Sequence, residues 1–273
     1  HIGTYNELVH ANSLLDLMER THRHDTYIDE RYINDSMKCH ATVLDGWCKS
    51  KSKGSEVKAE EILHRMEKRG RKGSRKMNGT NKHRLLPVKY YNNVMNRIAI
   101  SGKHYAGEEA ERLLNEMISS YKNHVMSDTS SNVSNSNATI VSSSSSTNTV
   151  APNRNSFNTV IKAYANAGGK HVISNVQRIL SMMEDPHSFS ELEYLPMEIV
   201  EQITPDKITY TSVLMAYGKS NDMYAGEKAE ELLSRMIEMG TKNDVVKPDT
   251  ITYNAVLKEW GKCGHPDAGE RSV

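Results

Sequence analysis

The side chains best suited to binding a ligand are short polar groups that recur at one position of a repeated pattern. Asn92, Asn158 and Asn254 each directly follow an aromatic residue that opens an apolar stripe, and Thr211 holds the same position in another copy. Amides and hydroxyls both donate and accept hydrogen bonds. Side chains at this position are expected to point away from the helix–helix core, so their recurrence favours a shared role in a groove. The alternative is that they are solvated or helix-capping residues.

Residues suited to catalysis or metal binding form no recognisable constellation. His22, His24 and Asp25 are metal-ligand types close together, but they lie in a polar connector and are interpreted as solvated. Cys39 and Cys48 lie on one predicted helix, about 13 Å apart along its axis, too far for a disulfide between them. The sequence has no CxxC pair and no glycine-rich phosphate loop. We therefore predict no enzymatic activity, no cofactor and no metal site.

Two kinds of apolar stripe alternate along the chain and set these polar positions. Each stripe has the spacing i, i+3, i+4, i+7, which is one face of an α-helix. First-type stripes open at His40, Tyr91, Phe157, Tyr210 and Tyr253, and second-type stripes open at Ala11, Ala59, Ala110, Val176 and Ala229. In the four full units the second stripe opens 19 residues after the first. The pattern is therefore an internal repeat.

An internal repeat in which each unit is a pair of helices predicts an all-α solenoid of helix-turn-helix repeats. We expect about four full repeats and a partial repeat at each end. The predicted segments are 1–20 (partial repeat, second helix), 21–35 (connector), 36–87 (repeat 1, with a basic loop), 88–153 (repeat 2, with an insertion at 127–150), 154–206 (repeat 3), 207–249 (repeat 4) and 250–273 (truncated repeat 5). A short irregular helix is also expected within 191–203, broken at Pro196.

Two connecting segments have unusual compositions. Residues 68–84 carry eight basic residues and no acidic one, which indicates a solvated loop or, alternatively, a phosphate-contacting arm. Residues 127–150 consist mostly of Ser, Asn and Thr and are predicted to be disordered. The net charge of the whole chain is only +1, which argues mildly against tight binding of a polyanion. No segment is long and apolar enough to cross a membrane.

The chain resembles the pentatricopeptide repeat family at several stripes. The matching segments are TPDKITYTSVLMAYGK at 204–219, KPDTITYNAVLKEWGK at 247–262, PNRNSFNTVI at 152–161, and the second-helix endings ELLSRM at 231–236 and EILHRM at 61–66. The tetratricopeptide family has a similar period, but its Trp–Leu-Gly–Tyr and closing Pro signatures are absent. The chain departs from the pentatricopeptide pattern at His40, which replaces the usual aromatic residue, and in its longer turns and joints.

This resemblance implies a right-handed α-solenoid that binds single-stranded RNA, with one repeat for each base. In the family, two side chains select the base: the residue after the aromatic of the first helix, and the last residue before the next repeat. The implied pairs are Asn92 with Asn153, Asn158 with Asp206, and Thr211 with Asp249, while Asn254 lacks a partner in the chain and Ala41, with Pro87 or its neighbour, reads no base.

The same resemblance assigns base preferences to these pairs. Asn with Asp favours uracil, Thr with Asp favours guanine, and Asn with Asn favours a pyrimidine, so the implied target core is 5′-pyrimidine-U-G-3′. Ile208 and Ile251 are expected to sandwich bases, whereas Lys89 and Asn155 hold that position in other repeats. Asp206 and Asp249 each follow a Pro and precede a helix, so they are also good N-caps.

Three lysines close first-type helices and are candidates for phosphate contacts. They are Lys49, Lys219 and Lys262. The alternative is that they complement the partial negative charge at a helix C-terminus.

We predict a sequence-selective single-stranded RNA-binding protein that acts in organellar RNA processing, stability or translation, in a mitochondrion or plastid. The alternative is a protein-binding helical scaffold that holds a peptide in its groove, which the near-neutral charge and Ala41 favour. The convex face and the loops are open to protein partners, and the oligomeric state is not predicted. Because the chain begins at His1, any targeting segment is expected to lie outside it.

Overall fold

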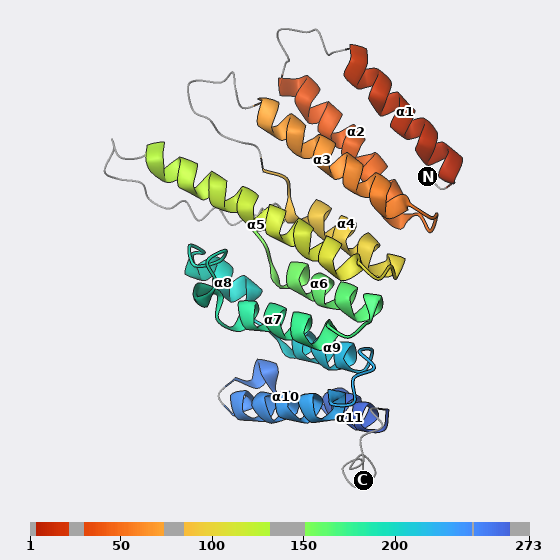
Figure 1. The fold of residues 1–273 in the computed structure, drawn as a ribbon. Helices are drawn as coiled ribbons and strands as arrows, with labels where there is room; N and C mark the ends of the chain where they lie inside the picture. Colours follow the sequence, from red (N-terminus) through yellow and green to blue (C-terminus); the bar gives the residue numbers. More distant parts are fainter. Residues whose placement is uncertain (1–3, 22–29, 74–84, 132–150, 242, 263–273) are drawn as a thin grey trace. The chain divides into compact units, whose positions relative to one another are not determined.

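The computed structural model describes residues 4–21, 30–73, 85–131, 151–241 and 243–262 (Figure 1). All regular elements in these ranges are helical. The chain divides into two compact units, residues 1–97 with 116–151 and residues 98–115 with 152–273. The division runs through α4 (Val88–Ser101) and α5 (Ala106–Ser131). The predicted all-α fold of helix-turn-helix repeats is confirmed for the described residues.

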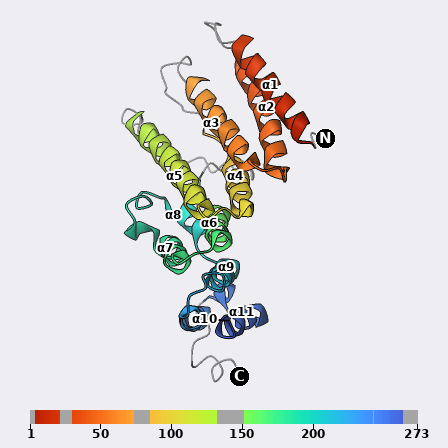
Figure 2. The ribbon, with the colours of Figure 1, turned by 45° about the vertical axis from the view of Figure 1, so that its right-hand side comes forward.

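The first unit begins with α1 (Tyr5–Thr21), α2 (Glu30–Lys49) and α3 (Ser55–Gly73). α2 contacts both α1 and α3 (Figures 1 and 2). The ring of Trp47, fully buried in α2, meets Tyr5 of α1 edge-on, with 5.7 Å between ring centroids. Arg97 of α4 is buried and donates from Nε to Ser55 Oγ at 2.7 Å, which ties α4 to the start of α3.

The second unit is built around α9. Its helices after residue 151 are α6 (Arg154–Ala167), α7 (Val172–Glu184), the 3-10 turn η2 (Pro186–Ser188), α8 (Met197–Ile203), α9 (Lys207–Tyr217), α10 (Ala225–Gly240), the 3-10 turn η3 (Asp244–Val246) and α11 (Thr250–Trp260). α9 contacts α6, α7, α10 and α11 (Figures 1 and 2). First-type helices α6, α9 and α11 therefore lie in sequence order, with α9 between the other two.

The predicted apolar stripes form the core. Every stripe residue of the units opening at His40, Tyr91 and Phe157 is buried, as are most of those in the unit opening at Tyr210. The exceptions lie mainly in α1 and α11. Leu14 is 65% exposed, and Tyr253 and Leu257 are each 45% exposed. Among the described residues, α1 has no first-type helix before it and α11 has no second-type helix after it, so these faces lack the partner that covers them elsewhere.

Two glycines seat aromatic rings between consecutive repeats. A Cβ added at Gly107 would lie 2.2 Å from Cδ1 of Tyr164, and one added at Gly226 would lie 2.7 Å from Cδ2 of Trp260. Both glycines stand three residues before the first residue of a second-type stripe, and both rings close the first-type stripe of the next repeat. Glycine therefore lets the ring rest directly on the helix backbone.

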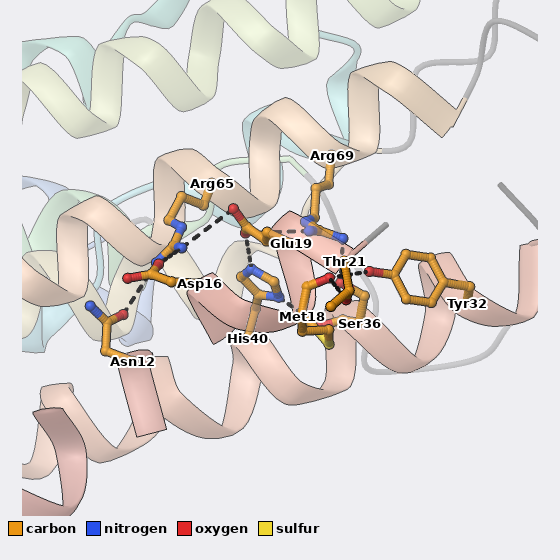
Figure 3. Close-up of polar contacts among 10 residues, drawn as sticks. All are labelled: Asn12, Asp16, Met18, Glu19, Thr21, Tyr32, Ser36, His40, Arg65 and Arg69. Carbon is orange, nitrogen blue, oxygen red and sulfur yellow. Dashed lines mark hydrogen bonds and ion pairs between the residues drawn. The ribbon is translucent and has the colours of Figure 1, made fainter. Parts of the chain in front are cut away.

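A carboxylate joins consecutive repeats in the first unit (Figure 3). Glu19 of α1 lies between His40 of α2 and the guanidinium groups of Arg65 and Arg69 of α3. The distance from Glu19 Oε1 to His40 Nε2 is 2.9 Å, and Nδ1 of the same fully buried ring lies 2.7 Å from the Ser36 carbonyl oxygen. The imidazole is thus held at both ring nitrogens.

The same joint recurs with tyrosine in place of histidine. Tyr210 donates from its hydroxyl to Glu184 Oε1 at 2.7 Å, and Arg235 of α10 pairs with the same carboxylate. Burial and the adjacent Glu184 raise the pKa of Tyr210, so its hydroxyl remains a donor at neutral pH. Tyr91 likewise donates to Glu67. His40 is therefore not an irregular member of the series, because it makes the contact that tyrosine makes elsewhere.

Several predicted boundaries need correction. Residues 30–35 were expected to belong to the connector 21–35, but they are the first residues of α2. Tyr32 stabilises this extension, since its hydroxyl donates to the Met18 carbonyl at 3.2 Å and its ring lies beneath Arg69. α3 continues to Gly73, into the basic segment 68–84, and α5 continues to Ser131, into the insertion 127–150. Each helix propagates beyond its apolar stripe because every added residue gains a backbone hydrogen bond.

Some predictions fall outside the described residues. These are the proposed loop character of 74–84, the disorder of 132–150, and the solvated interpretation of His22, His24 and Asp25. Within the described ranges, no group of three or more His, Cys, Asp or Glu side chains has an arrangement suited to a metal ion. None of the described helices has the length and apolar character needed to cross a membrane.

Candidate nucleic-acid interface

The first-type helices of the second unit begin with the same capping arrangement. Asn153, Asp206 and Asp249 are the N-caps of α6, α9 and α11. The backbone N–H three residues later donates to the cap oxygen Oδ1, at 3.2 Å from Ser156, 2.9 Å from Thr209 and 3.0 Å from Thr252. Each pair completes a capping box, which satisfies backbone donors that the helix itself leaves free. The predicted N-cap role of the two aspartates is confirmed.

A basic residue links each of two helix starts to the next N-cap. Arg154, the first residue of α6, places Nη1 3.2 Å from Asp206 Oδ2 and donates from Nε to the Thr204 carbonyl at 2.5 Å. Lys207, the first residue of α9, places Nζ 2.9 Å from Asp249 Oδ2. The N-termini of α6, α9 and α11 are therefore joined side by side. Sequence reasoning missed these two cations, although a basic residue directly after an N-cap was the available signal.

The residues after the stripe aromatics lie one helical turn beyond these cations. Asn158 follows Arg154 by four residues and Thr211 follows Lys207 by four, so each pair lies on one face of its helix. Thr211 is half-buried and donates from Oγ1 to the Lys207 carbonyl at 2.8 Å. Asn158 is half-buried, and its Oδ1 is buried without a hydrogen-bond partner among the described residues. Asp206 and Asp249 occupy the helix starts next to these faces.

The remaining predicted base-selecting residues lie in different settings. Asn92 is half-buried in α4 and Asn254 is exposed in α11. The implied pair of Asn92 with Asn153 is divided between the two units. The members of the other two implied pairs, Asn158 with Asp206 and Thr211 with Asp249, belong to one and the same unit.

The side chains predicted to sandwich bases are open to solvent. Ile208 is 66% exposed and Ile251 is 67% exposed, high values for isoleucine. Lys89 and Asn155, at the equivalent position of other repeats, are exposed as well. This position is therefore a surface position in all four helices, whatever residue occupies it.

Two of the three candidate phosphate lysines bond within the chain. Lys49 pairs with Asp45, one turn earlier on α2, at 2.6 Å. Lys219 donates to Asn166 Oδ1 at 2.8 Å, and Asn166 in turn donates to the Ala99 carbonyl at 2.9 Å. Lys262 is exposed at the end of the described range. Lys49 and Lys219 are exposed as well, and an exposed ion pair such as that of Lys49 with Asp45 is weak.

Charge on the Asp249 carboxylate is strongly favoured. The hydrogen bond from Lys207, followed by those from Thr252, lowers the pKa of Asp249 to about 2. The carboxylate is therefore ionised at neutral pH and acts only as a hydrogen-bond acceptor.

The thiol of Cys48 is held in its neutral form, because burial and then the nearby Asp45 raise its pKa to about 12. A thiol of this kind does not act as a nucleophile at neutral pH.

Comparison with known proteins agrees with this arrangement. Residues 198–263, which include α9, α10 and α11, match the model of the pentatricopeptide repeat domain. These residues are similar to pentatricopeptide repeats. The matched segment includes Asp206, Thr211, Asp249 and Asn254. Pentatricopeptide repeat proteins typically bind RNA, generally have no enzymatic activity and are commonly organellar. A search among curated proteins found no match to the chain.

Proposed function

We propose that this chain binds single-stranded RNA sequence-selectively, with one repeat for each base, in organellar RNA processing, stability or translation. The observation that carries the proposal is the twofold arrangement in the second unit. Asn158 with Asp206, and Thr211 with Asp249, occupy equivalent places at the starts of neighbouring first-type helices. A surface that repeats at each helix pair matches a ligand that repeats at each nucleotide.

The chemistry of these side chains favours particular bases. A carboxylate only accepts hydrogen bonds, so Asp206 and Asp249 suit bases with an N–H donor on the Watson–Crick edge. Uracil offers N3–H and guanine offers N1–H, whereas cytosine and adenine present acceptor nitrogens there. We therefore propose uracil opposite Asn158 with Asp206, and guanine opposite Thr211 with Asp249. Asn92 with Asn153 extends the target to 5′-pyrimidine-U-G-3′.

Other contacts complete the proposed interface. Ile208 and Ile251 stack against bases, and Lys262 contacts a backbone phosphate. Lys49 and Lys219 also contact phosphates, after they release Asp45 and Asn166. We propose a mitochondrial or plastid location because pentatricopeptide repeat proteins are commonly organellar. With so few repeats, the expected affinity is low.

A protein-binding scaffold is the second candidate. The observation in its favour is the apolar character of one face of α9 and α11, where Ile208, Met215 and Ile251 are all more than half exposed. Clustered exposed apolar side chains are typical of surfaces that bind peptides. The two candidates differ in salt dependence, because phosphate contacts weaken as salt concentration rises.

Fluorescence anisotropy on the chain tests the proposal. Short single-stranded RNAs containing the pyrimidine-U-G core, or the same core with U and G exchanged, are compared at two salt concentrations. We expect salt-dependent binding with preference for U-G. The double variant Asn158→Thr with Thr211→Asn is expected to invert that preference. Absence of RNA binding would favour the scaffold, and binding indifferent to sequence would refute the proposed pairs.

A further inference from the structure

The cations at the starts of α6 and α9 reach the carboxylates that the proposed function assigns to base selection. Arg154 opens the repeat that ends at Asp206, and Lys207 opens the repeat that ends at Asp249. Their distances to the carboxylate oxygens are 3.2 and 2.9 Å. In each repeat the first residue therefore contacts the last, across an interval of 52 or 42 positions.

Both oxygens of each carboxylate are engaged. Oδ1 of Asp206 accepts from the Thr209 backbone N–H and hydroxyl, at 2.9 and 3.1 Å, and Oδ2 faces Arg154. Oδ1 of Asp249 accepts the same two bonds from Thr252, at 3.0 and 3.1 Å, and Oδ2 faces Lys207. A carboxylate has about four acceptor sites in total. Three are occupied, so one site on Oδ2 remains for a ligand donor.

Charge is matched between the first and last residues of successive repeats. The repeat before Arg154 opens its helix with Val88 and ends at Asn153, both uncharged. The next two repeats open with a cation and end with an aspartate. One of these cations is Arg and the other is Lys, so the shared property is positive charge and not guanidinium geometry.

We propose that Arg154 and Lys207 are positioning residues for base selection, each holding an aspartate so that one Oδ2 acceptor site faces the base. This inference rests on the proposed function. The capping box bonds only to Oδ1, so small rotations of the carboxylate about its Cβ–Cγ bond are restrained at one oxygen alone. The cation fixes Oδ2 and compensates the negative charge that would otherwise face an approaching phosphate backbone. The single remaining site then accepts from uracil N3–H or guanine N1–H and rejects cytosine and adenine.

A contribution to stability alone does not account for the arrangement well. Exposed ion pairs of this kind contribute little to the stability of a fold. The side chain of Lys207 is 42% exposed and that of Arg154 is 35% exposed. Lys228, paired with Glu231 on α10 and 43% exposed, is a matched lysine that contacts no N-cap in the structure described.

The test measures base discrimination by the whole chain. Dissociation constants are determined for the pyrimidine-U-G RNA and for two probes, one with U replaced by C and one with G replaced by A. Arg154→Gln is expected to reduce the U-over-C ratio about threefold to tenfold while leaving the G-over-A ratio unchanged. Lys207→Gln is expected to do the reverse. Arg154→Lys and Lys207→Arg should retain both ratios, and Lys228→Gln should change neither.

Other outcomes overturn the inference in distinguishable ways. If each Gln variant binds all probes more weakly by one factor, with a shallower salt dependence, the cation contacts phosphate and does not position the aspartate. If the ratios stay unchanged or rise, the ion pair is incidental or competes with the base. In these cases the wild-type chain still discriminates, so the proposed function stands. If the wild-type chain binds no RNA, the proposed function and this inference fail together.

Discussion

His40 of α2 lies with its Nε2 2.9 Å from the carboxylate of Glu19 in α1, at the register where Tyr210 donates to Glu184 in the second unit. In both places an arginine one residue before the closing Met of the next second-type helix reaches the same carboxylate. A buried ring, a carboxylate and a guanidinium therefore form one recurring joint. The joint accepts histidine or tyrosine because both carry a polar hydrogen at the end of a flat ring.

Glu19→Gln tests this joint in the first unit. Burial acts to raise the pKa of Glu19, but the His40 hydrogen bond and the charges of Arg65 and Arg69 outweigh it and lower the pKa. The ionised carboxylate therefore stabilises the fold above the ordinary pKa of a glutamate. We expect the substitution to reduce the free energy of unfolding at pH 7 by about 1–3 kcal/mol, measured by urea denaturation.

The pH dependence and a matched variant make this test specific. The difference between wild type and Glu19→Gln should shrink as pH falls below 4.5 through the lowered pKa of Glu19, because the wild-type carboxyl then becomes protonated too. Glu61→Gln, on an exposed pair with Lys58, should change stability by less than about 0.5 kcal/mol. Equal effects of the two substitutions would contradict a special role for the joint.

Gly226→Ala is expected to destabilise the second unit. The new methyl group would lie 2.7 Å from the buried ring of Trp260, which is closer than van der Waals contact allows. Forcing extra volume into such a contact costs about 1–3 kcal/mol, visible as a lower thermal midpoint. Gly261→Ala is the control, since its Cβ would meet nothing closer than 3.5 Å. Destabilisation by both substitutions to the same degree would count against the seating of Trp260 on Gly226.

Asp249→Asn separates the charge of an N-cap from its capping hydrogen bonds. Asn caps helices about as well as Asp, so the Thr252 bonds can persist while the Lys207 ion pair is lost. Because the folded-state pKa is lowered from 3.8 to about 2, wild type should be the more stable protein at neutral pH. That advantage should hold constant from pH 5 to 8, shrink as pH falls from 3.8 towards 2, and vanish below about 2.

Thermal unfolding of both proteins across pH measures the Asp249 effect. Lys207→Met in the wild-type background should remove most of the pH dependence that Asp249 contributes, since Lys207 is the largest cause of the lowered pKa. A constant difference between wild type and Asp249→Asn down to pH 2 would show that the carboxylate charge is not linked to folding.

Glu259→Gln is expected to stabilise the chain at neutral pH. Glu259 is 4% exposed, and its Oε2 is buried without a hydrogen-bond partner among the described residues. Burial raises its pKa, opposed by Lys262 and Lys258. A folded protein that contains a carboxyl with a raised pKa becomes less stable as pH rises above the ordinary pKa of that carboxyl. The neutral amide of glutamine avoids this loss of stability.

A pH series distinguishes this effect from a simple change in packing. The thermal midpoint of Glu259→Gln should exceed that of wild type at pH 7 by a few degrees, on the order of 1 kcal/mol. The two midpoints should converge near pH 4, where the carboxyl is protonated in wild type. A variant that is less stable at every pH would show that the glutamate is satisfied in a way that the amide cannot reproduce.

The sequence alone was sufficient to locate the apolar stripe of each repeat helix. The spacing i, i+3, i+4, i+7 places four side chains on one helical stripe regardless of what packs against it. The stripes opening at Tyr91 and Phe157 are therefore buried as predicted. Local chemistry likewise identified Asp206 and Asp249 as N-caps, because a cap bonds to its own helix three residues later.

Only the tertiary structure decided which side chains meet across the joints. Arg154 meets Asp206, and Glu19 meets both His40 and Arg65, through connections whose lengths differ from repeat to repeat. Periodicity determines the face on which a residue lies but not the residue opposite it in the next repeat. The exposure of Leu14 and Tyr253 shows the same limit, since burial of a stripe depends on a neighbouring helix as well as on its own sequence.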